Sequence, residues 1–344
     1  MDKKNLLKLL NDTKENDTSS SEGKRTLLID GLNLFFRNFA MMNMVNPSGI
    51  HIGGLGGFFR SLGAEIRRTQ PDEVYVVFDG AGSTTNRKNI ISEYKSGRED
   101  QRVTNWEVFD SLDDEHDSKV DQIVRVIHYL KTLPVKTVIL DKVEADDIIA
   151  YLCDKLPNHP DDKIFIVSSD KDFLQLVNKN VIVYRPMEKK YYTEEVFRAK
   201  YNMSPQNFIL HKTLLGDNSD KIPGVKGLGE KGIFKKFPEL TEKKLTLEDI
   251  FDISARKFKE HVVYSRIVHD RTKLENSYKI MDLSVPMVDD QQIEYLDYLI
   301  EEKFPDLNSK MFIQLYNEDK LGGMIRNLDI WLKEKFYHFK GYKD

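Results

Sequence analysis

The sequence predicts an α/β protein built on a parallel β-sheet, and three observations support that prediction. Short β-branched runs such as RTLLID, EVYVVFD and KIFIV alternate with longer amphipathic segments, which is typical of parallel strands joined by crossover helices. The chain has 344 residues, of which 40% are hydrophobic, enough for one large domain or a core with one attached. Finally, acidic residues directly follow several of the strands.

Composition excludes several classes of protein. The chain has no run of eighteen apolar residues and no export signal, so a membrane protein and a secreted protein are both excluded. The single cysteine, Cys153, excludes a disulfide framework and a cysteine-rich zinc site, which favours a reducing cytoplasm. The net charge of −4 would argue against a polyanionic partner only if the acids were spread evenly.

The first elements follow in order. Residues 1–24 are polar and turn-rich, and we expect a disordered leader. The first strand then ends at Asp30, and a later strand ends at Asp79. Between them, SGIHIGGLGGFFRSLGAEIRR lacks the GK[ST] of a P-loop. Its glycines are therefore expected to allow close helix packing or the approach of a ligand.

A long insertion, roughly residues 81–120, follows Asp79. Its first half brings together Arg87, Tyr94, Lys95 and Arg98, whereas its second half, SLDDEHDSK, is acidic. An insertion of this length with little core-forming pattern is usually a functional loop or lid, and a solvated surface helix is the alternative. Tyr94 either stacks on a base or packs in the interior.

Acidic residues crowd two further junctions. Glu144, Asp146 and Asp147 lie within four positions at the start of an apolar helix, and Asp170 and Asp172 follow the strand KIFIV. One such cluster could simply suit the positive end of a helix dipole. Burying several carboxylates together without compensation is costly, however, and the carboxyl ends of parallel strands meet at one edge. Acids at four junctions therefore predict one shared site that cations fill.

The segment PQNFILHKTLLGDNSDKIPGVKGLGEKG adds a second kind of site. Asp217 and Asp220 are two more acids. Glycines and lysines follow them: Gly224, Lys226, Gly227, Gly229, Lys231, Lys235 and Lys236. A glycine turn whose amides face an anion, surrounded by lysines, suits the phosphates of a duplex. From about residue 240 to 344 the pattern is helical.

The motifs IDG, VFDG, VEADD, SSDKDFLQL and GDNSDKIPGVKGLGEKG, in that order, resemble the structure-specific 5′ nucleases. This family includes flap endonucleases, the 5′ nuclease domains of bacterial DNA polymerases and phage enzymes, and the T-even phage ribonuclease H type looks closest. The resemblance covers about residues 25–285. It implies a PIN-like nuclease core at 25–215 with a helical arch at about 81–120. At 216–344 it implies a helix–three-turn–helix element and a helical C-terminal region.

The resemblance also assigns roles. The acids that match its metal site are Asp30, Asp79, Glu144, Asp146, Asp147, Asp170, Asp172, Asp217 and Asp220. The residues that match its basic arch residues, which contact the scissile phosphate, are Lys95 and Arg98, with Arg87 as a looser match. The residues expected to bind DNA are Tyr94, Gly224, Lys226, Gly227, Gly229 and Lys231. It implies two Mg²⁺ ions, with Mn²⁺ able to substitute, and relatives often hold a K⁺ ion on backbone carbonyls of the glycine turn.

The expected function is cleavage of 5′ flaps and 5′ ends of DNA or RNA–DNA hybrids, with removal of RNA primers in phage-type replication. The expected partners are branched or nicked duplex DNA, with a single-strand DNA-binding protein or sliding clamp as candidates for recruitment. A phage-encoded enzyme would act in the host cytoplasm. A single-strand ribonuclease of the PIN type and a junction-binding protein with a relic site are the alternatives. Two departures from the family stand out: the acidic half of the insertion and the leader.

Overall fold

The computed structural model describes residues 23–97, 102–336 and 339. At its centre lies a six-stranded sheet of order β3-β2-β1-β4-β5-β6. The strands are β1 (Arg25–Asp30), β2 (Glu73–Asp79), β3 (Lys136–Leu140), β4 (Lys163–Val167), β5 (Val181–Arg185) and β6 (Lys190–Tyr192). The first five are parallel and β6 returns antiparallel to β5, which confirms the predicted α/β class. Residues 1–22 of the expected leader and Arg98 lie outside the described residues, whereas Lys24 is described and its backbone N–H donates to Asp162 Oδ1 at 2.7 Å.

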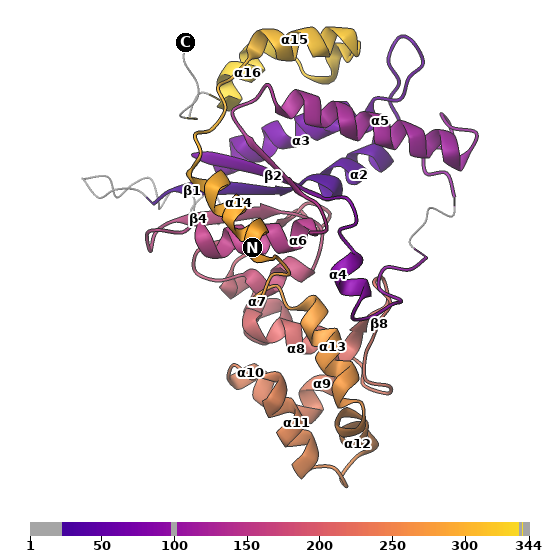
Figure 1. Cartoon of the computed structure of the whole chain (residues 1–344), viewed down its shortest axis with the longest axis vertical. Helices are drawn as coiled ribbons and strands as arrows, with labels where there is room; N and C mark the ends of the chain where they lie inside the picture. The colour runs from indigo at the N-terminus through magenta and orange to yellow at the C-terminus, as the bar shows by residue number, and fades with distance from the viewer. Residues whose placement is uncertain (1–22, 98–101, 337–338, 340–344) are drawn as a thin grey trace.

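Both faces of the sheet are buried. Neighbouring residues of a strand point to opposite sides, so each strand contributes side chains to the apolar clusters on both faces. Leu27 and Ile29 of β1 face one apolar cluster, and Leu28 between them faces the other. Figure 1 shows the helices on the two sides of the sheet. The first cluster is covered by α2 (Gly31–Met41), α3 (Gly53–Thr69) and α5 (Leu112–Leu130). The second is covered by α6 (Ala145–Lys155), α7 (Glu194–Tyr201), α8 (Phe208–Leu215) and α14 (Asp290–Glu301).

The glycine-rich segment forms the start of α3 and packs closely on α2. A Cβ at Gly54 would lie 2.6 Å from the Phe35 ring, and one at Gly57 would lie 2.7 Å from Asn38 Cβ. The two helices could not approach so closely with larger side chains at these positions. Of the two sequence-based interpretations, helix packing therefore describes these two glycines.

The insertion after β2 contains α4 (Thr85–Lys88), a run of turns and then α5. Residues 98–101 lie outside the described part, so the helical arch stays a prediction. The described residues also include three short 3₁₀ helices, at Asp172–Leu176, Pro205–Asn207 and Gly322–Met324. No helix of the described residues is long and apolar enough to cross a membrane.

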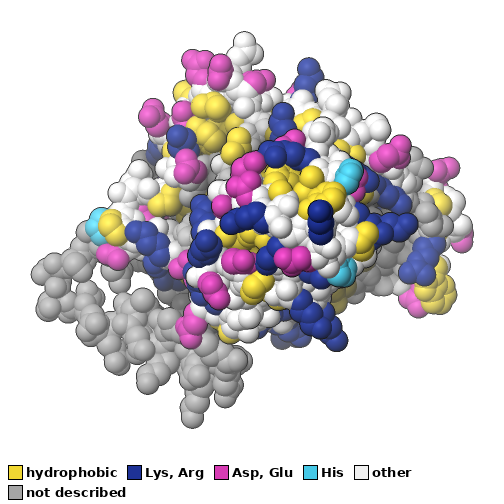
Figure 2. Space-filling view, turned by 90° about the horizontal axis from the view of Figure 1, so that it is seen from below, with side chains coloured by type: hydrophobic (Ala, Val, Ile, Leu, Met, Phe, Trp, Pro, Cys, Tyr) yellow, Lys and Arg dark blue, Asp and Glu magenta, His cyan; other side chains and the backbone are white. Residues whose placement is uncertain are grey.

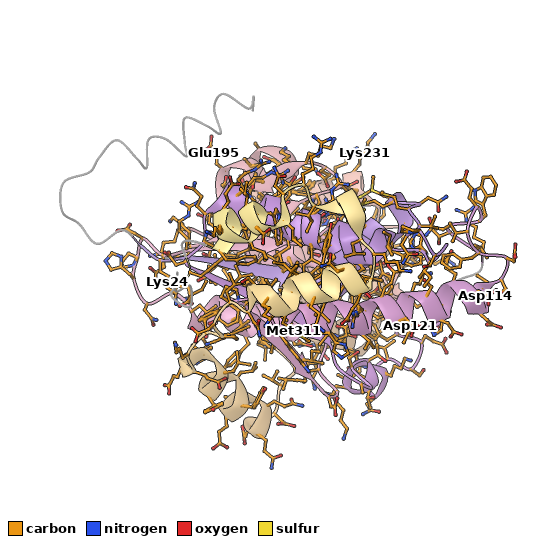
Figure 3. The ribbon with its side chains drawn as sticks, turned by 90° about the horizontal axis from the view of Figure 1, so that it is seen from above. Lys24, Asp114, Asp121, Glu195, Lys231 and Met311 are labelled. Carbon is orange, nitrogen blue, oxygen red and sulfur yellow. The ribbon has the colours of Figure 1, made fainter. Side chains whose placement is uncertain are left out.

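A helical lobe extends away from the sheet on the side of α7 and α8 (Figure 1). It contains the pair β7 (Gly216–Asp217) and β8 (Ile222–Pro223), then α9 (Glu230–Lys236), α10 (Glu239–Glu242), α11 (Leu247–Arg256), α12 (Val262–His269) and α13 (Arg271–Met281). The chain then returns to the core through α14, α15 (Ser309–Glu318) and α16 (Leu328–Phe336). Figure 3 shows α15, which carries Met311, beside α5, which carries Asp114 and Asp121. Arg125 of α5 joins them through Asp319, at 2.8 Å.

Candidate metal centre

The strand order reverses between β1 and β4, and their carboxyl ends therefore border a crevice. Asp30 is the last residue of β1 and also caps α2, accepting from Asn33 N at 3.1 Å. Ser168, just past β4, donates to Asp30 Oδ2 at 2.8 Å and accepts from Asp170 N at 3.0 Å. One serine thus ties together the acids at two neighbouring strand ends.

Electrostatic effects place five of the predicted acids in one group. Burial raises the pKa of Asp30 to about 7, and the charges of Asp170 and Asp79 add to the rise. Burial also raises the pKa of Asp146 well above its usual value, and the nearby charges of Asp170, Asp30 and Glu144 contribute. The acids brought together are Asp30, Asp79, Glu144, Asp146 and Asp170. They come from the ends of β1 and β2, the start of α6 and the loop after β4.

Glu144 links this group to the insertion. Its Oε2 accepts from Lys95 Nζ at 2.9 Å and from the Tyr94 hydroxyl at 3.0 Å. Its Oε1 is buried and has no hydrogen-bond partner among the described residues. Lys95 itself has a positive φ of 52°, and its backbone N–H donates to Asp220 O at 3.0 Å. The predicted catalytic lysine therefore stands at the acidic site.

A second group contains a residue that the sequence analysis missed. Lys212 of α8 forms ion pairs with Asp172 and, at 3.0 Å, with Asp217. Burial and the charge of Asp170 raise the pKa of Asp172 to about 6, although Lys212 opposes the rise. Burial would raise the pKa of Asp217, but Lys212 and Ser219 outweigh it and lower that pKa. A lysine inside the apolar run FILHKTLL was the available signal.

An open cavity of about 630 Å³ lies beside these carboxylates. Its wall includes Asn33, Asp170, Asp172, Lys212 and Asp217. Asp220, the last predicted acid of this group, is 8% exposed and accepts from Ser219 Oγ at 3.3 Å. The cavity is thus bordered by acids from both groups, because Asp170 belongs to each of them.

Asp147 and Arg87 are paired with each other at the edge of the first acidic group, where Arg87 Nη1 also forms an ion pair with Glu144 Oε2 at 3.3 Å. Arg87 Nη1 and Nη2 donate to the two Asp147 oxygens at 2.6 and 3.0 Å, and Met287 N also donates to Asp147 Oδ1, at 2.9 Å. Arg87 is 3% exposed and donates through Nε to Ile280 O. The metal role predicted for Asp147 and the phosphate contact predicted for Arg87 do not match these enclosed positions.

Tyr94 also differs from its DNA-binding expectation. Its side chain is 3% exposed and packs among Ile209, Ile222 and Ile280. The ring therefore has no free face for a base, and the packing alternative describes it. Its hydroxyl is nevertheless tied to the acidic site through Glu144.

Among the described residues, no three acidic, histidine or cysteine side chains converge closely enough to hold a metal ion in their present arrangement. Two neighbouring lysines pair with several of these carboxylates instead. Lys95 draws one oxygen of Glu144, and Lys212 draws Asp172 and Asp217. The chemistry of the set still fits a hard divalent cation, because its donors are carboxylate oxygens and Glu144 Oε1 has no partner among the described residues. Burial, with the neighbouring negative charges, also raises the pKa values of Asp30 and Asp146.

The predicted glycine turn lies between β8 and α9. A Cβ at Gly224 would overlap the backbone of Leu215, and Gly227 has a positive φ of 82°. Gly229 caps α9. Lys226 and Lys231 are exposed on this part of the lobe. The backbone therefore needs glycine at Gly224 and Gly227, and both lysines are open to solvent.

Comparison with known proteins places the chain in a family. Residues 25–202 match the family described as the 5′-3′ exonuclease N-terminal resolvase-like domain. The chain is 31% identical over 310 residues to a 5′-3′ exonuclease of Aquifex aeolicus (strain VF5), covering 89% of this chain and 96% of that protein. It is 32% identical over 245 residues to DNA polymerase I of Bacillus subtilis (strain 168), covering 70% of this chain but 26% of the polymerase.

Solved structures support the fold. The phage T5 5′-exonuclease with bound zinc has a TM-score of 0.66 at 20% identity, covering 81% of this chain and 99% of the other. Human GEN1 in complex with Holliday junction DNA has a TM-score of 0.55 at 14% identity, covering 92% of this chain and 71% of the other. The PIN-like nuclease architecture is therefore confirmed. Because residues 25–202 match the family and the Aquifex aeolicus exonuclease is matched over nearly its whole length, this chain belongs to the 5′-3′ exonuclease family.

Proposed function

We propose that the chain is a divalent-metal-dependent nuclease that hydrolyses phosphodiester bonds at 5′ flaps and 5′ ends. One observation carries the proposal: five acids from two strand ends, the start of α6 and the loop after β4 gather at the reversal point of the sheet, and Glu144 Oε1 is buried there with no partner among the described residues. Such a group is unfavourable by itself and is stabilised when cations enter it. The family match agrees with this reading.

Two Mg²⁺ ions, with Mn²⁺ as a substitute, are the proposed cofactors. Asp30, Asp79, Glu144, Asp146 and Asp170 would hold one ion, and Asp172, Asp217 and Asp220 would hold the other. Mg²⁺ keeps several waters and takes few direct carboxylates, so only some of these acids need to contact metal. When bound, two such ions supply an activated water and offset charge on the attacking and leaving oxygens. Structural relatives with bound divalent ions support this assignment.

The chain's own residues act around that centre. Lys95, within 2.9 Å of Glu144, would stabilise negative charge on the scissile phosphate, and we assign Arg98 the same role from the resemblance. Lys212 would hold Asp172 and Asp217 in place until cations arrive. Arg87 and Asp147 are positioning residues, because their pair fixes the start of α6 to the insertion.

We assign duplex DNA with a 5′ flap, nick or hybrid end as the substrate, and removal of RNA primers as the role. The glycine turn with Lys226 and Lys231 would contact the phosphates of the duplex without reading sequence. Seen from the lobe end, Figure 2 shows Lys and Arg side chains spread among acids over this face. A single-strand DNA-binding protein or sliding clamp as recruiter, and a phage origin, belong to the same proposal.

Cleavage of an end-labelled 5′-flap duplex in Mg²⁺ tests the proposal. We expect wild-type product carrying a 5′-phosphate, none in EDTA, and a loss of at least about a hundredfold in Asp79→Asn, because a carboxylate of the site is removed. Asp154→Asn is the matched control, since Asp154 is an exposed acid of α6 outside the site. Near-normal cleavage by Asp79→Asn would refute the metal role. Tight flap binding without cleavage by wild type would favour the junction-binding alternative.

A further inference from the structure

The glycine turn at 224–229 is fixed from below by the lobe's apolar core. Val225 and Leu228 are buried there together with Ile233 of α9. Leu228 N donates to Val225 O at 3.0 Å, which closes the turn. Lys226 and Gly227, between the two anchors, are exposed. The Lys226 carbonyl is therefore presented at a defined position on a rigid loop.

An arginine from another helix donates a hydrogen bond to that carbonyl oxygen. Arg266 of α12 donates through Nη1 to Lys226 O at 2.6 Å. A Cβ at Gly227 would lie 2.9 Å from the same nitrogen, so a side chain there would obstruct the contact. The absence of a Cβ at Gly227 therefore serves two ends: it permits the positive φ and it admits the guanidinium.

Helix α12 is well anchored for this purpose. Val263, Tyr264 and Ile267 are buried in the same core as the turn. The Tyr264 hydroxyl donates to Lys236 O at 3.0 Å, at the end of α9. Arg266 and Tyr264 thus connect α12 to both ends of the unit formed by the turn and α9. The guanidinium is delivered by a fixed element.

The charge of Arg266 has no acidic counterpart in the part of the chain that the structure describes. No carboxylate of those residues forms an ion pair with it, and the Lys226 carbonyl is its acceptor. Backbone carbonyls directed at one point are the ligands by which proteins hold monovalent cations. A monovalent cation that used the Lys226 carbonyl oxygen would therefore share it with the guanidinium.

We propose that Arg266 takes the place of the K⁺ ion that the family resemblance implies at this turn. A K⁺ ion on the same oxygen would stand about 4 Å from the guanidinium. At the effective dielectric of a protein surface, repulsion between two positive charges at that distance lowers the affinity of the turn for K⁺ by roughly a thousandfold. The residues present do not fit a second cation. The turn carries its own cation, and its conformation is independent of the salt in solution.

The first test uses the free protein, so it does not depend on DNA binding. Thermal unfolding is followed in KCl and in tetramethylammonium chloride, whose cation is too bulky for a carbonyl site. A ligand that binds only the folded state raises Tm. We expect the same Tm for wild type in both salts, and for Arg266→Gln a lower Tm that K⁺ partly restores. Arg271→Gln is the matched control, because Arg271 is a neighbouring arginine that pairs with Glu248 and Glu275 on the surface.

Two results would overturn the inference. One is a wild-type Tm that rises with K⁺ and saturates, with the same rise in Arg266→Gln. The other is an Arg266→Gln protein that behaves like Arg271→Gln in both salts.

The second readout rests on the proposed function. Duplex binding is measured by fluorescence anisotropy in an Asp79→Asn background, which prevents cleavage. We expect equal affinity in the two salts with Arg266, and with Arg266→Gln an affinity about tenfold weaker in tetramethylammonium than in K⁺, since a charged hydrogen bond is lost. Binding that needs K⁺ in the presence of Arg266 contradicts the inference. If the protein fails to bind duplex in any salt while the Tm results are as expected, the nuclease proposal is refuted and the inference about Arg266 is still supported.

Discussion

At neutral pH the buried carboxyl group of Asp30 should lower the free energy of unfolding of the metal-free protein. Its pKa is about 7 when folded, against 3.8 in its ordinary state, so the folded protein binds the extra proton between those values. Stability therefore falls as pH rises through this window, and the full cost is present above pH about 7.

Asp30→Asn should remove that cost. In EDTA at pH 8 we expect the variant to be more stable than wild type by up to about 4 kcal/mol, and at pH about 4 the two should be equal. Mg²⁺ should reverse the order, because only wild type offers the charged ligand. Urea unfolding at the two pH values, with and without Mg²⁺, measures this. A stability difference that does not change with pH would show that the Asp30 carboxyl is not the source.

Arg87 and Asp147 form a buried pair, so removal of one partner leaves a buried charge. Arg87→Met should destabilise the protein by about 3–5 kcal/mol, whereas the double variant Arg87→Met/Asp147→Leu should regain much of that loss. Chemical denaturation of the two variants tests the coupling. Equal destabilisation of the single and double variants would show that the pair contributes nothing beyond its packing.

Lys95 contacts the acidic site through one side-chain bond and the lobe through its backbone. Lys95→Ala should slow single-turnover cleavage by about a hundredfold or more, the size typical of a lost transition-state donor. The Kd for flap DNA should change much less, and Lys88→Ala of α4, an exposed lysine, is the control. An effect confined to Kd would reassign Lys95 to substrate binding.

At the scale of elements, helix α8 brings an internal cation to the acids of two other segments. Lys212→Met should leave Asp172 and Asp217 close together without their ammonium group. We expect a Tm in EDTA several degrees lower, consistent with a loss of about 2 kcal/mol or more, and a larger rise in Tm on adding Mg²⁺ than in wild type. Calorimetry in EDTA and in Mg²⁺ measures both. An unchanged response to Mg²⁺ would separate Lys212 from the metal site.

The elements that could be predicted are those whose pattern is local. Strand β1 reads as a β-branched run, and its acid stands at a strand end because of the chain's order alone. The pairing of Arg87 with Asp147 could not be read in this way, since the two lie far apart in sequence. Tyr94 shows the same limit: its burial depends on α8 and α13 packing over it. The spacing of apolar residues shows which face of a helix or strand is buried, but tertiary packing decides which element covers that face.

At the scale of the whole molecule, the C-terminal helices complete the nuclease core. Phe312, Leu315 and Phe336 are buried in the same cluster as Leu27 of β1. The sequence predicted helices from about 240 to 344, and the helices are present. Their return to the sheet was not predicted, because amphipathic spacing does not say which surface a helix covers.

Removal of residues 307–344 should therefore abolish cooperative folding. Each large apolar side chain lost from the core contributes about 1.5–3 kcal/mol, and the sum is comparable with the whole stability of a domain. Far-UV circular dichroism during urea unfolding would report the loss of a single transition. A truncated protein that unfolds as sharply as the full chain would show that α15 and α16 are accessory.

The same return of the chain governs how the protein is made. While the chain emerges from the ribosome, β1 and α3 are made early, and the part of their apolar cluster that Phe312, Leu315 and Phe336 cover stays exposed until α15 and α16 are made. A nascent chain with exposed apolar surface is a substrate for chaperones, and slow synthesis would prolong the period in which it can aggregate.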